Sequence, residues 1–434
     1  MSLTWLQRSA LWLYGWAMWA LLPLLRRKLR RRGAKEPGYL LHPEQRWGLY
    51  PGVAPQTGAV WVHAVSLGET RAAAILLKAL REQQPGVRIL LTHGTATGWQ
   101  EGTRLLQAGD VQVWQPWDTP SVLQRFLARF QPRMGVVLET EVWPHWVQAC
   151  AERGLPLHLV NARLSERSLN KAWAQRWLAL PAYGRLHSVL PQTEADAQRL
   201  RQLGAPVKAV MGNLKYDVSV NPDQQALGLR WRQAAARPVV MLASSREGEE
   251  AQCLDVIRQL GEAADTVQWL LVPRHPQRFY AVAQLIEQAG WRVARRSQWA
   301  LDTPPPTSPD APRTLWLGDS LGEMQAYYHL ASVAWLGGSF EPLGGQNLIE
   351  AAACGCPIVM GPHTFNFADA AEQAQQSSVA IRVATMEQAW VVTNRLVLNP
   401  NQINKIGLLG KDFIGAHSGS ALKCANELSK PRIN

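Results

Sequence analysis

The sequence is poor in cysteine and lacks the spacings that mark disulfide or metal sites. It contains only 5 cysteines in 434 residues, which is an odd number. Cys354 and Cys356 flank a single glycine, and no partner His or Cys lies at zinc-site spacing. The histidines are scattered, with no His-x-x-x-His pair. We therefore expect no metal centre, and reduced, mostly buried thiols in a cytosolic protein.

Two phosphate-binding motifs are also missing. Neither a P-loop nor a Gly-x-Gly-x-x-Gly fingerprint occurs, so ATP hydrolysis and dinucleotide binding lose support. Acidic residues are in deficit, because 33 Asp and Glu stand against 45 Lys and Arg, for a formal net charge of +12. That excess suits a phosphate-rich partner, an anionic bilayer or a polyanionic substrate, without choosing among them.

The first 35 residues have the composition of a membrane anchor. Residues 9–25 are almost wholly apolar, and a basic run at 26–32 follows at once. A helix of about 17 residues spans roughly 26 Å, slightly less than the roughly 30 Å hydrocarbon core. Tryptophans prefer the lipid interface, and the basic run keeps the rest of the chain in the cytoplasm. We predict an anchor over 1–35 that spans or lies in the bilayer, a buried core helix being the alternative. The tryptophans concerned are Trp5, Trp12, Trp16 and Trp19.

The remainder predicts two α/β domains, since the length exceeds what one hydrophobic core usually serves. Short apolar strands alternate with helical stretches, which is typical of βαβ units and a parallel sheet. The pattern breaks near residues 216–225, so we assign 36–220 and 221–434 to separate domains. The expected strands lie at 61–65, 89–93, 111–114, 134–138, 157–160, 238–243, 266–272, 314–317, 334–340 and 357–360.

The junction after the first strand is the strongest candidate for a catalytic position. The strand ends in Ser66-Leu67-Gly68, and a helix begins at Glu69. A carboxylate in the first turn of a helix is favoured in its ionised form by the helix dipole. An ionised carboxylate at the ligand edge of a parallel sheet suits a general base. The alternative is that Glu69 only complements the helix dipole.

Other polar residues follow strands in the same way. Glu139 with Glu141, and Asn161 with Arg163, come at later strand ends of the first domain. Lys215, near the domain crossing, can pair with a phosphate or a carboxylate. Taken alone, such a lysine is more often a solvated surface charge.

In the second domain, Gly344-Gly345-Gln346-Asn347 resembles a glycine-rich turn that opens a helix. Free amides at a helix start bind phosphate, and Glu350, one turn on, can accept ribose hydroxyls. A plain tight turn is equally compatible with two glycines. Arg274, after a strand, is a further candidate for a phosphate or carboxylate.

Six ordered segments carry a resemblance to a known family. They are similar to the bacterial 3-deoxy-D-manno-octulosonic acid (Kdo) transferases, which move Kdo from CMP-Kdo onto a lipid A precursor. The resemblance covers roughly residues 59–367 and the N-terminal anchor, while the tail from about Asn399 matches less clearly. Leu348 stands where that family often has proline. The segments are Ser66–Glu69, Glu139–Pro144, Asn161–Ser165, Gly212–Asp217, Val272–Pro276 and Met360–Phe367.

The resemblance implies a GT-B fold, in which two Rossmann-like domains face a central cleft. The first domain would bind the acceptor and the second the CMP-sugar. It further implies an inverting, metal-independent transfer to lipid IVA in lipopolysaccharide biosynthesis, without a cofactor. The enzyme would lie on the cytoplasmic side of the inner membrane. Glu69 resembles the proton acceptor, and Glu139 and Lys215 resemble transition-state-stabilising residues. The implied CMP-binding residues are Pro273, Arg274, Leu321, Gly322, Glu323, Asn347, Leu348, Ile349 and Glu350.

Three other functions remain possible on the sequence. One is a GT-B transferase that uses a UDP-sugar, and another is a non-catalytic lipopolysaccharide-binding scaffold. A nucleic-acid-binding protein is the weakest, because the positive charge has no aromatic-interleaved binding strip and much of it lies beside the anchor. The expected partners are therefore CMP-Kdo, a lipid A precursor and an anionic membrane surface. The number of Kdo units and the oligomeric state stay open.

Overall fold

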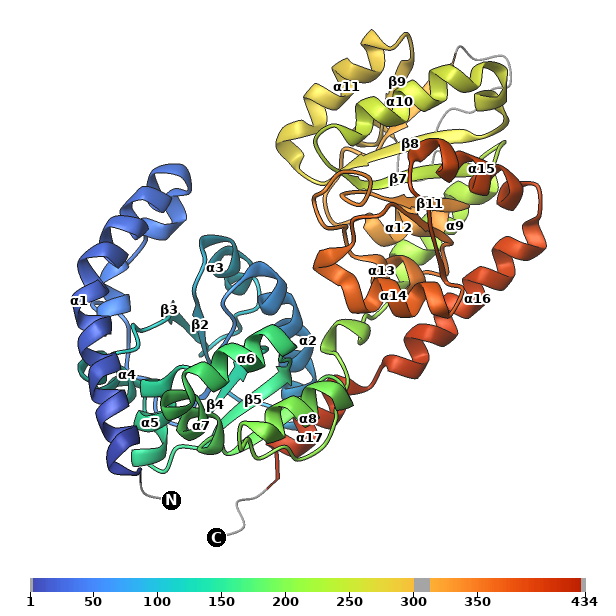
Figure 1. Ribbon diagram of the computed structural model, residues 1–434. Coiled ribbons are helices and arrows are strands. Elements are labelled where there is room, and N and C mark those ends of the chain that lie inside the picture. Colours follow the sequence, from blue (N-terminus) through green and yellow to red (C-terminus); the bar gives the residue numbers. More distant parts are fainter. Residues whose placement is uncertain (1–2, 300–312, 431–434) are drawn as a thin grey trace. The chain divides into compact units, whose positions relative to one another are not determined.

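The computed structural model describes residues 3–299 and 313–430, which form two compact units (Figure 1). The first unit is Met1–Asp217 with Ser418–Asn434, and the second is Val218–His417. The change from one unit to the other at Asp217 lies within the stretch expected to link them. The last four residues of the expected C-terminal tail lie outside the described part.

The first unit is built on a six-stranded parallel sheet with the order β3-β2-β1-β4-β5-β6. This is the Rossmann order, in which the chain leaves β1 in one direction and returns to its other side at β4. Such a sheet binds ligands beside that switch point, at the carboxyl ends of its strands. The strands are β1 (Val60–His63), β2 (Ile89–His93), β3 (Val111–Trp114), β4 (Met134–Leu138), β5 (Leu157–Ala162) and β6 (Ser188–Pro191).

Helices cover both faces of this sheet, since side chains alternate between the faces along each strand. Val60 and Val62 of β1 pack with the apolar side of α2, whereas Trp61 packs on the other face against Phe126 and Trp146. The helices are α1 (Trp5–Lys35), α2 (Leu67–Gln83), α3 (Ala96–Thr103), α4 (Pro120–Phe130), α5 (Pro144–Glu152), α6 (Glu166–Ala174), α7 (Arg176–Gly184), α8 (Glu194–Gln202) and α17 (Ser420–Leu428), with 3₁₀ helices η1 (Pro37–Leu40), η2 (Pro43–Trp47) and η3 (Leu214–Tyr216).

The second unit contains a seven-stranded parallel sheet of order β13-β12-β11-β7-β8-β10-β9. Its switch point lies between β7 and β11. The strands are β7 (Val239–Ser245), β8 (Gln268–Pro273), β9 (Arg292–Arg295), β10 (Thr314–Leu317), β11 (Val333–Leu336), β12 (Ile358–Met360) and β13 (Ala380–Arg382).

Helices of the second unit follow its strands in the same alternation. A large apolar cluster on one face joins β7, β8 and β11 to α10, α11 and α15. The helices are α9 (Pro222–Ala234), α10 (Glu249–Leu260), α11 (Phe279–Gln288), α12 (Met324–Leu330), α13 (Leu348–Ala353), α14 (Ala368–Gln376), α15 (Met386–Val397) and α16 (Pro400–His417), with 3₁₀ helices η4 (Gly261–Thr266), η5 (Pro276–Arg278), η6 (Arg296–Gln298) and η7 (Phe365–Phe367).

The C-terminal helix differs from the expected domain boundary. Residues 221–434 were all expected in the second domain, but α17 belongs to the first unit (Figure 1). Its apolar side contributes Ala421, Cys424, Ala425 and Leu428 to the core cluster that contains α2. The physical reason is this spacing of three, four and seven residues, which gives α17 one apolar side that must be buried.

The N-terminal helix α1 packs on the first unit instead of standing free. The Tyr14 hydroxyl donates a 2.8 Å hydrogen bond to the buried Asp118 carboxylate, and its ring lies 5.3 Å from that of His145. No helix among the described residues is both long enough and apolar enough to cross a bilayer.

Candidate active site

Glu69 lies at the start of α2, directly after β1. Ser66 caps the helix, with its Oγ accepting from the Glu69 amide at 3.4 Å. The Glu69 carboxylate reaches back and accepts from the Val65 amide at 2.6 Å and from the Ser66 hydroxyl at 3.3 Å. Ser66 is the N-cap and Val65 precedes it, so these bonds fix the carboxylate at the end of β1.

The charge state of Glu69 differs from the expectation. Burial raises the pKa of Glu69 to about 7, and the nearby Glu139 and Glu141 add to the rise. Hydrogen bonds from Val65 and Ser66 oppose it but do not cancel it. The expected stabilisation of the ionised form by the helix dipole is therefore outweighed by desolvation. A carboxyl group with a pKa near neutrality is better matched to proton transfer at neutral pH.

Glu139 and Lys215 form an ion pair at the same edge of the sheet. The Lys215 Nζ lies 3.3 Å from the Glu139 Oε1, and both side chains are partly buried. Glu139 follows β4, the neighbour of β1, and its backbone is left-handed with φ of 56°. Because β1 and β4 pair in parallel, Glu69 and the Glu139–Lys215 pair lie at the same edge of the sheet in the first unit.

Glu141 belongs to the same edge, although no role was predicted for it. Its Oε2 accepts a 2.7 Å hydrogen bond from the Trp143 indole, and burial raises its pKa. The Glu-x-Glu spacing after β4 is the sequence signal for this second carboxyl group.

The predicted phosphate turn of the second unit follows β11. Gly344 and Gly345 have φ of 90° and 73°, which glycine adopts without strain. The Asn347 side chain accepts from the Ile349 amide at 3.1 Å, so it caps the short helix α13. The side chains of Leu348 and Ile349 are buried, hence only their backbone could contact a ligand.

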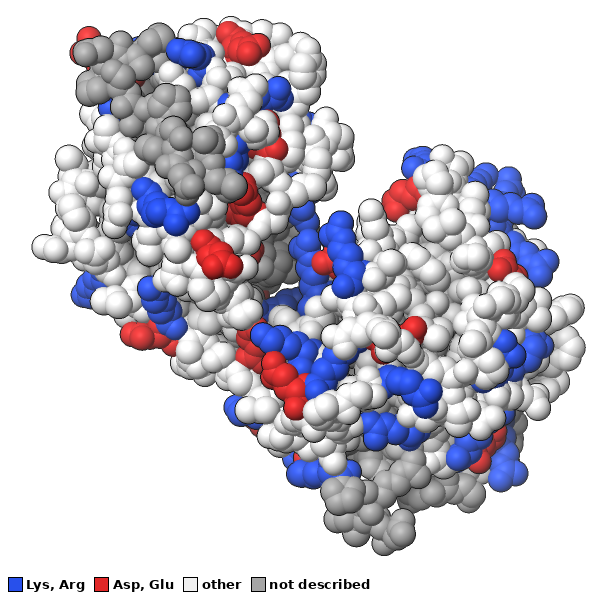
Figure 2. Space-filling view, turned by 180° about the vertical axis from the view of Figure 1, so that it is seen from behind, with Lys and Arg blue, Asp and Glu red and all other residues white. Residues whose placement is uncertain are grey.

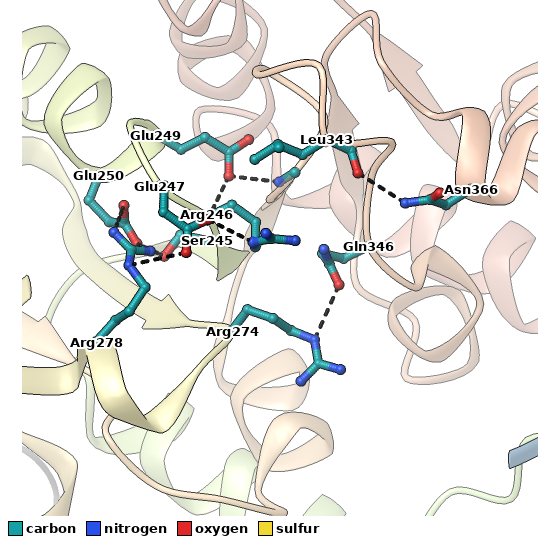
Figure 3. Close-up of polar contacts among 11 residues, drawn as sticks. Ser245, Arg246, Glu247, Glu249, Glu250, Arg274, Arg278, Leu343, Gln346 and Asn366 are labelled. Carbon is teal, nitrogen blue, oxygen red and sulfur yellow. Dashed lines mark hydrogen bonds and ion pairs between the residues drawn. The ribbon is translucent and has the colours of Figure 1, made fainter. Parts of the chain in front are cut away.

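Arg274 connects that turn to the first two strands of the second sheet. Its amide donates to the Ser245 carbonyl at 3.0 Å, and its Nε donates to the Gln346 Oε1 at 3.3 Å (Figure 3). Burial lowers the pKa of the adjacent His275, and the charges of Arg246 and Arg274 lower it further. A cationic cluster thus forms at the end of β8, where Pro273 closes the strand.

The predicted segment 321–323 lies after β10 in the second unit. Leu321 is 71% exposed, and Gly322 has φ of 81°. Glu323 accepts from Arg296 at 2.7 Å and from Ser320 at 2.5 Å, so its carboxylate has protein partners on both oxygens. The Glu323 carboxylate therefore holds this loop through its bonds to Arg296 and Ser320, whereas the Leu321 side chain is open to solvent.

Glu249 is a residue that the sequence did not single out. It is 0% exposed and accepts backbone N–H bonds from Arg246 at 2.9 Å, Gly338 at 2.7 Å and Phe340 at 3.1 Å. These bonds tie the loop after β7 to the loop after β11 that leads to the glycine-rich turn (Figure 3). Beside it, Glu250 receives two bonds from Arg278. The consecutive glutamates at the start of α10 are the signal that could have indicated this clamp.

Charged side chains of both signs are spread over the surface drawn in Figure 2. On the face drawn, Lys and Arg lie on both units, interspersed with Asp and Glu, and form no single continuous strip. Within 3–299 and 313–430, no group of three or more His, Cys, Asp or Glu side chains could hold a metal ion. The five cysteines are all buried.

Comparison with known proteins identifies close relatives. A sequence model described as 3-Deoxy-D-manno-octulosonic-acid transferase (kdotransferase) matches residues 42–218. A 3-deoxy-D-manno-octulosonic acid transferase of Bordetella pertussis is 42% identical over 96% of this chain and 98% of its own length. A probable mitochondrial 3-deoxy-D-manno-octulosonic acid transferase of Arabidopsis thaliana is 31% identical over 92% of this chain and 91% of its own.

Solved structures share the fold at low identity. UDP-GlcNAc 2-epimerase of Neisseria meningitidis aligns with a TM-score of 0.55 and 13% identity, over 86% of this chain and 100% of that one. A glycosyltransferase of Rickettsia africae aligns with a TM-score of 0.53 and 12% identity, over 86% of this chain and 97% of that one. The chain thus has two parallel-sheet α/β domains, and glycosyltransferases are among its structural neighbours.

We expect the replacement Arg274→Ala to weaken the binding of CMP. A charged hydrogen bond to phosphate contributes about 1.5–3 kcal/mol, which corresponds to roughly 10- to 150-fold in affinity. Titration calorimetry with CMP measures the effect. Arg258→Ala, which removes an exposed guanidinium of α10, is the matched control. Equal affinities of the two variants for CMP would mean that Arg274 does not bind the nucleotide.

Proposed function

The chain belongs to the 3-deoxy-D-manno-octulosonic acid (Kdo) transferase family, and we propose that it transfers Kdo from CMP-Kdo to a lipid A precursor, lipid IVA. It is accordingly a glycosyltransferase that transfers Kdo. The observation that carries the mechanism is the partly buried Glu69 carboxylate beside the Glu139–Lys215 pair. This edge of the first unit supplies a base of suitable pKa and a fixed cation.

In the proposed reaction, Glu69 removes the proton from an acceptor sugar hydroxyl. The oxygen attacks the anomeric carbon of Kdo, a new C–O bond forms, and the bond from that carbon to the CMP phosphate oxygen breaks. The electron pair leaves with the phosphate. Attack on one face in a single displacement inverts the anomeric configuration, as in other inverting sugar transfers.

The charges that develop have partners among the described residues. Arg274 and the backbone amides of the glycine-rich turn would bind the phosphate of CMP. Lys215, held against Glu139, would stabilise charge at the reacting sugar. CMP carries one phosphate, so these groups can balance its charge without the divalent ion that a diphosphate donor favours.

Product analysis tests this function directly. With CMP-Kdo and lipid IVA we expect mass spectrometry to detect lipid products heavier by whole Kdo units, and NMR to show an inverted anomeric centre. UDP-sugars serve as the alternative donors. Turnover with a UDP-sugar alone would contradict the proposal, and no turnover with any donor would favour a non-catalytic scaffold.

Replacing Glu69 tests the proposed base. Glu69→Gln is expected to lower kcat by about 10²- to 10⁴-fold, because the amide cannot accept the proton. Titration with CMP should be unchanged, since the predicted nucleotide residues lie in the second unit. The control is Glu82→Gln, an exposed glutamate of the same helix. Unimpaired transfer by Glu69→Gln would mean that another group is the base.

The pH profile gives an independent readout of Glu69. A base acts in its deprotonated form, and burial raises the pKa of Glu69 to about 7. In the wild type, kcat/KM should therefore fall about tenfold per pH unit below that value. The fall should be absent from the residual activity of Glu69→Gln.

A membrane-surface location is proposed for α1. Four tryptophans on this helix are strongly exposed, and the basic run 26–32 continues the same helix. Since the helix docks on the first unit through Tyr14, the arrangement supports a helix that lies on the inner membrane, at its cytoplasmic side. The exposed fractions are 74% for Trp5, 62% for Trp12, 53% for Trp16 and 65% for Trp19.

We expect the triple replacement of Trp12, Trp16 and Trp19 by alanine to weaken vesicle binding by about tenfold or more. Co-sedimentation with vesicles of phosphatidylethanolamine and phosphatidylglycerol measures the change. A matched control truncates three exposed apolar residues of the second unit, Tyr280, Leu398 and Leu408. Loss of binding in the control, or its retention in the tryptophan variant, would contradict a membrane-facing α1.

A further inference from the structure

Asn161 occupies an unusual backbone position at the carboxyl end of β5. Its φ is 54°, in the left-handed region that non-glycine residues seldom adopt. The side chain is buried, and its Oδ1 accepts a 3.0 Å hydrogen bond from the amide of Leu214. That amide begins η3, the short helix that carries Lys215.

Backbone hydrogen bonds at the same end of β5 also hold Glu139, which follows the neighbouring strand β4. The Glu139 amide donates to the Val160 carbonyl at 3.0 Å, and the Arg163 amide donates to the Glu139 carbonyl at 3.3 Å. Asn161 stands between these two backbone contacts. The backbone on both sides of Asn161 therefore forms hydrogen bonds with Glu139, while the Asn161 side chain holds the turn that bears Lys215.

The turn has other anchors beside Asn161: the Met211 amide donates to the Pro191 carbonyl of β6 at 3.0 Å, and the Leu214 side chain is buried in the core. The Lys215 amide is held at 3.0 Å by the Asn213 side chain, which is a local contact within the same loop. Asn161 comes from a different part of the chain and connects the loop to the sheet. The carbonyl of Asn161 is in turn held by the Gln192 side chain at 2.9 Å.

Glycine would satisfy the backbone at position 161 at lower cost. It adopts left-handed φ freely, whereas asparagine adopts it with some strain. The Asn161 Nδ2 is buried without a hydrogen-bond partner among the residues that the structure describes, which is unfavourable as well. What asparagine adds over glycine is the carbonyl oxygen that binds the Leu214 amide.

We infer that Asn161 is a positioning residue for the Glu139–Lys215 pair, setting the Nζ-to-carboxylate geometry through the Leu214 amide. The inference rests on the proposed role of that pair in transfer. Asn161 itself acts through Lys215 and need not touch substrate. A displacement of about 1 Å at a catalytic group costs roughly 10²-fold in rate.

Asn161→Gly tests the inference, because it retains the left-handed backbone and removes only the side chain. We expect kcat to fall about 10- to 100-fold, with the affinity for CMP within about twofold of wild type. Hydrogen exchange measured by mass spectrometry should speed up in the peptide that contains 212–217. Gln131→Gly is the control, since Gln131 is an exposed left-handed residue (φ 39°) at the end of α4.

A double-mutant cycle separates positioning from general destabilisation. If Asn161 acts through Lys215, adding Asn161→Gly to Lys215→Ala should change the residual rate by less than about twofold. If the two substitutions instead lower the rate by independent factors that multiply, the inference is overturned. An unaltered rate of hydrogen exchange at 212–217 in a folded Asn161→Gly variant would overturn it as well. Full activity of Lys215→Ala would instead refute the proposed role of the pair, while the exchange measurement would still decide whether Asn161 holds the turn.

Discussion

Parallel pairing of β1 with β4 is the constraint on which the candidate site depends. It aligns Val60 with Met134 and His63 with Val137, so that the two strands end side by side. Glu69 and Glu139 are far apart in the sequence, and only this register brings their carboxyl groups to one edge. Burial at that edge then raises the pKa of Glu69, because water is replaced by protein and by neighbouring carboxyl groups.

The alternation of apolar strands with helices was enough to predict two α/β domains and ten of the thirteen strands that the structure describes. Strands such as Met134–Leu138 lie at their predicted bounds, because their side chains are buried on both faces and form continuous apolar runs. Glu69 and Glu139 could be placed at strand ends from the sequence and Lys215 near the domain crossing, and the structure brings them together. Their catalytic roles came from the family resemblance and remain proposals, as do those of the nucleotide residues in the second unit.

Three features could not be predicted from local patterns. Strands β6, β9 and β13 were not predicted; β9 includes two arginines and β13 has only 3 residues, so the apolar signal of these two is weak. The return of α17 to the first unit depends on a long-range contact that no local pattern encodes. The pKa of Glu69 depends on how deeply the finished fold buries it, whereas the sequence showed only its place at a helix start.

Backbone strain gathers where the strands end. Glu139, Asn161 and Ser244 have φ of 56°, 54° and 54°. Glu139 directly follows β4, and Asn161 and Ser244 are the last residues but one of β5 and β7. Such conformations cost of order 1–3 kcal/mol each, and they persist where surrounding contacts enforce them. In the first unit those contacts include the Asn161 bond to the turn of Lys215. In the second unit, Glu249 binds three backbone amides around the loops that follow β7 and β11. Buried side-chain oxygens thus hold the ligand-side loops of both sheets, since no strand pairing extends that far.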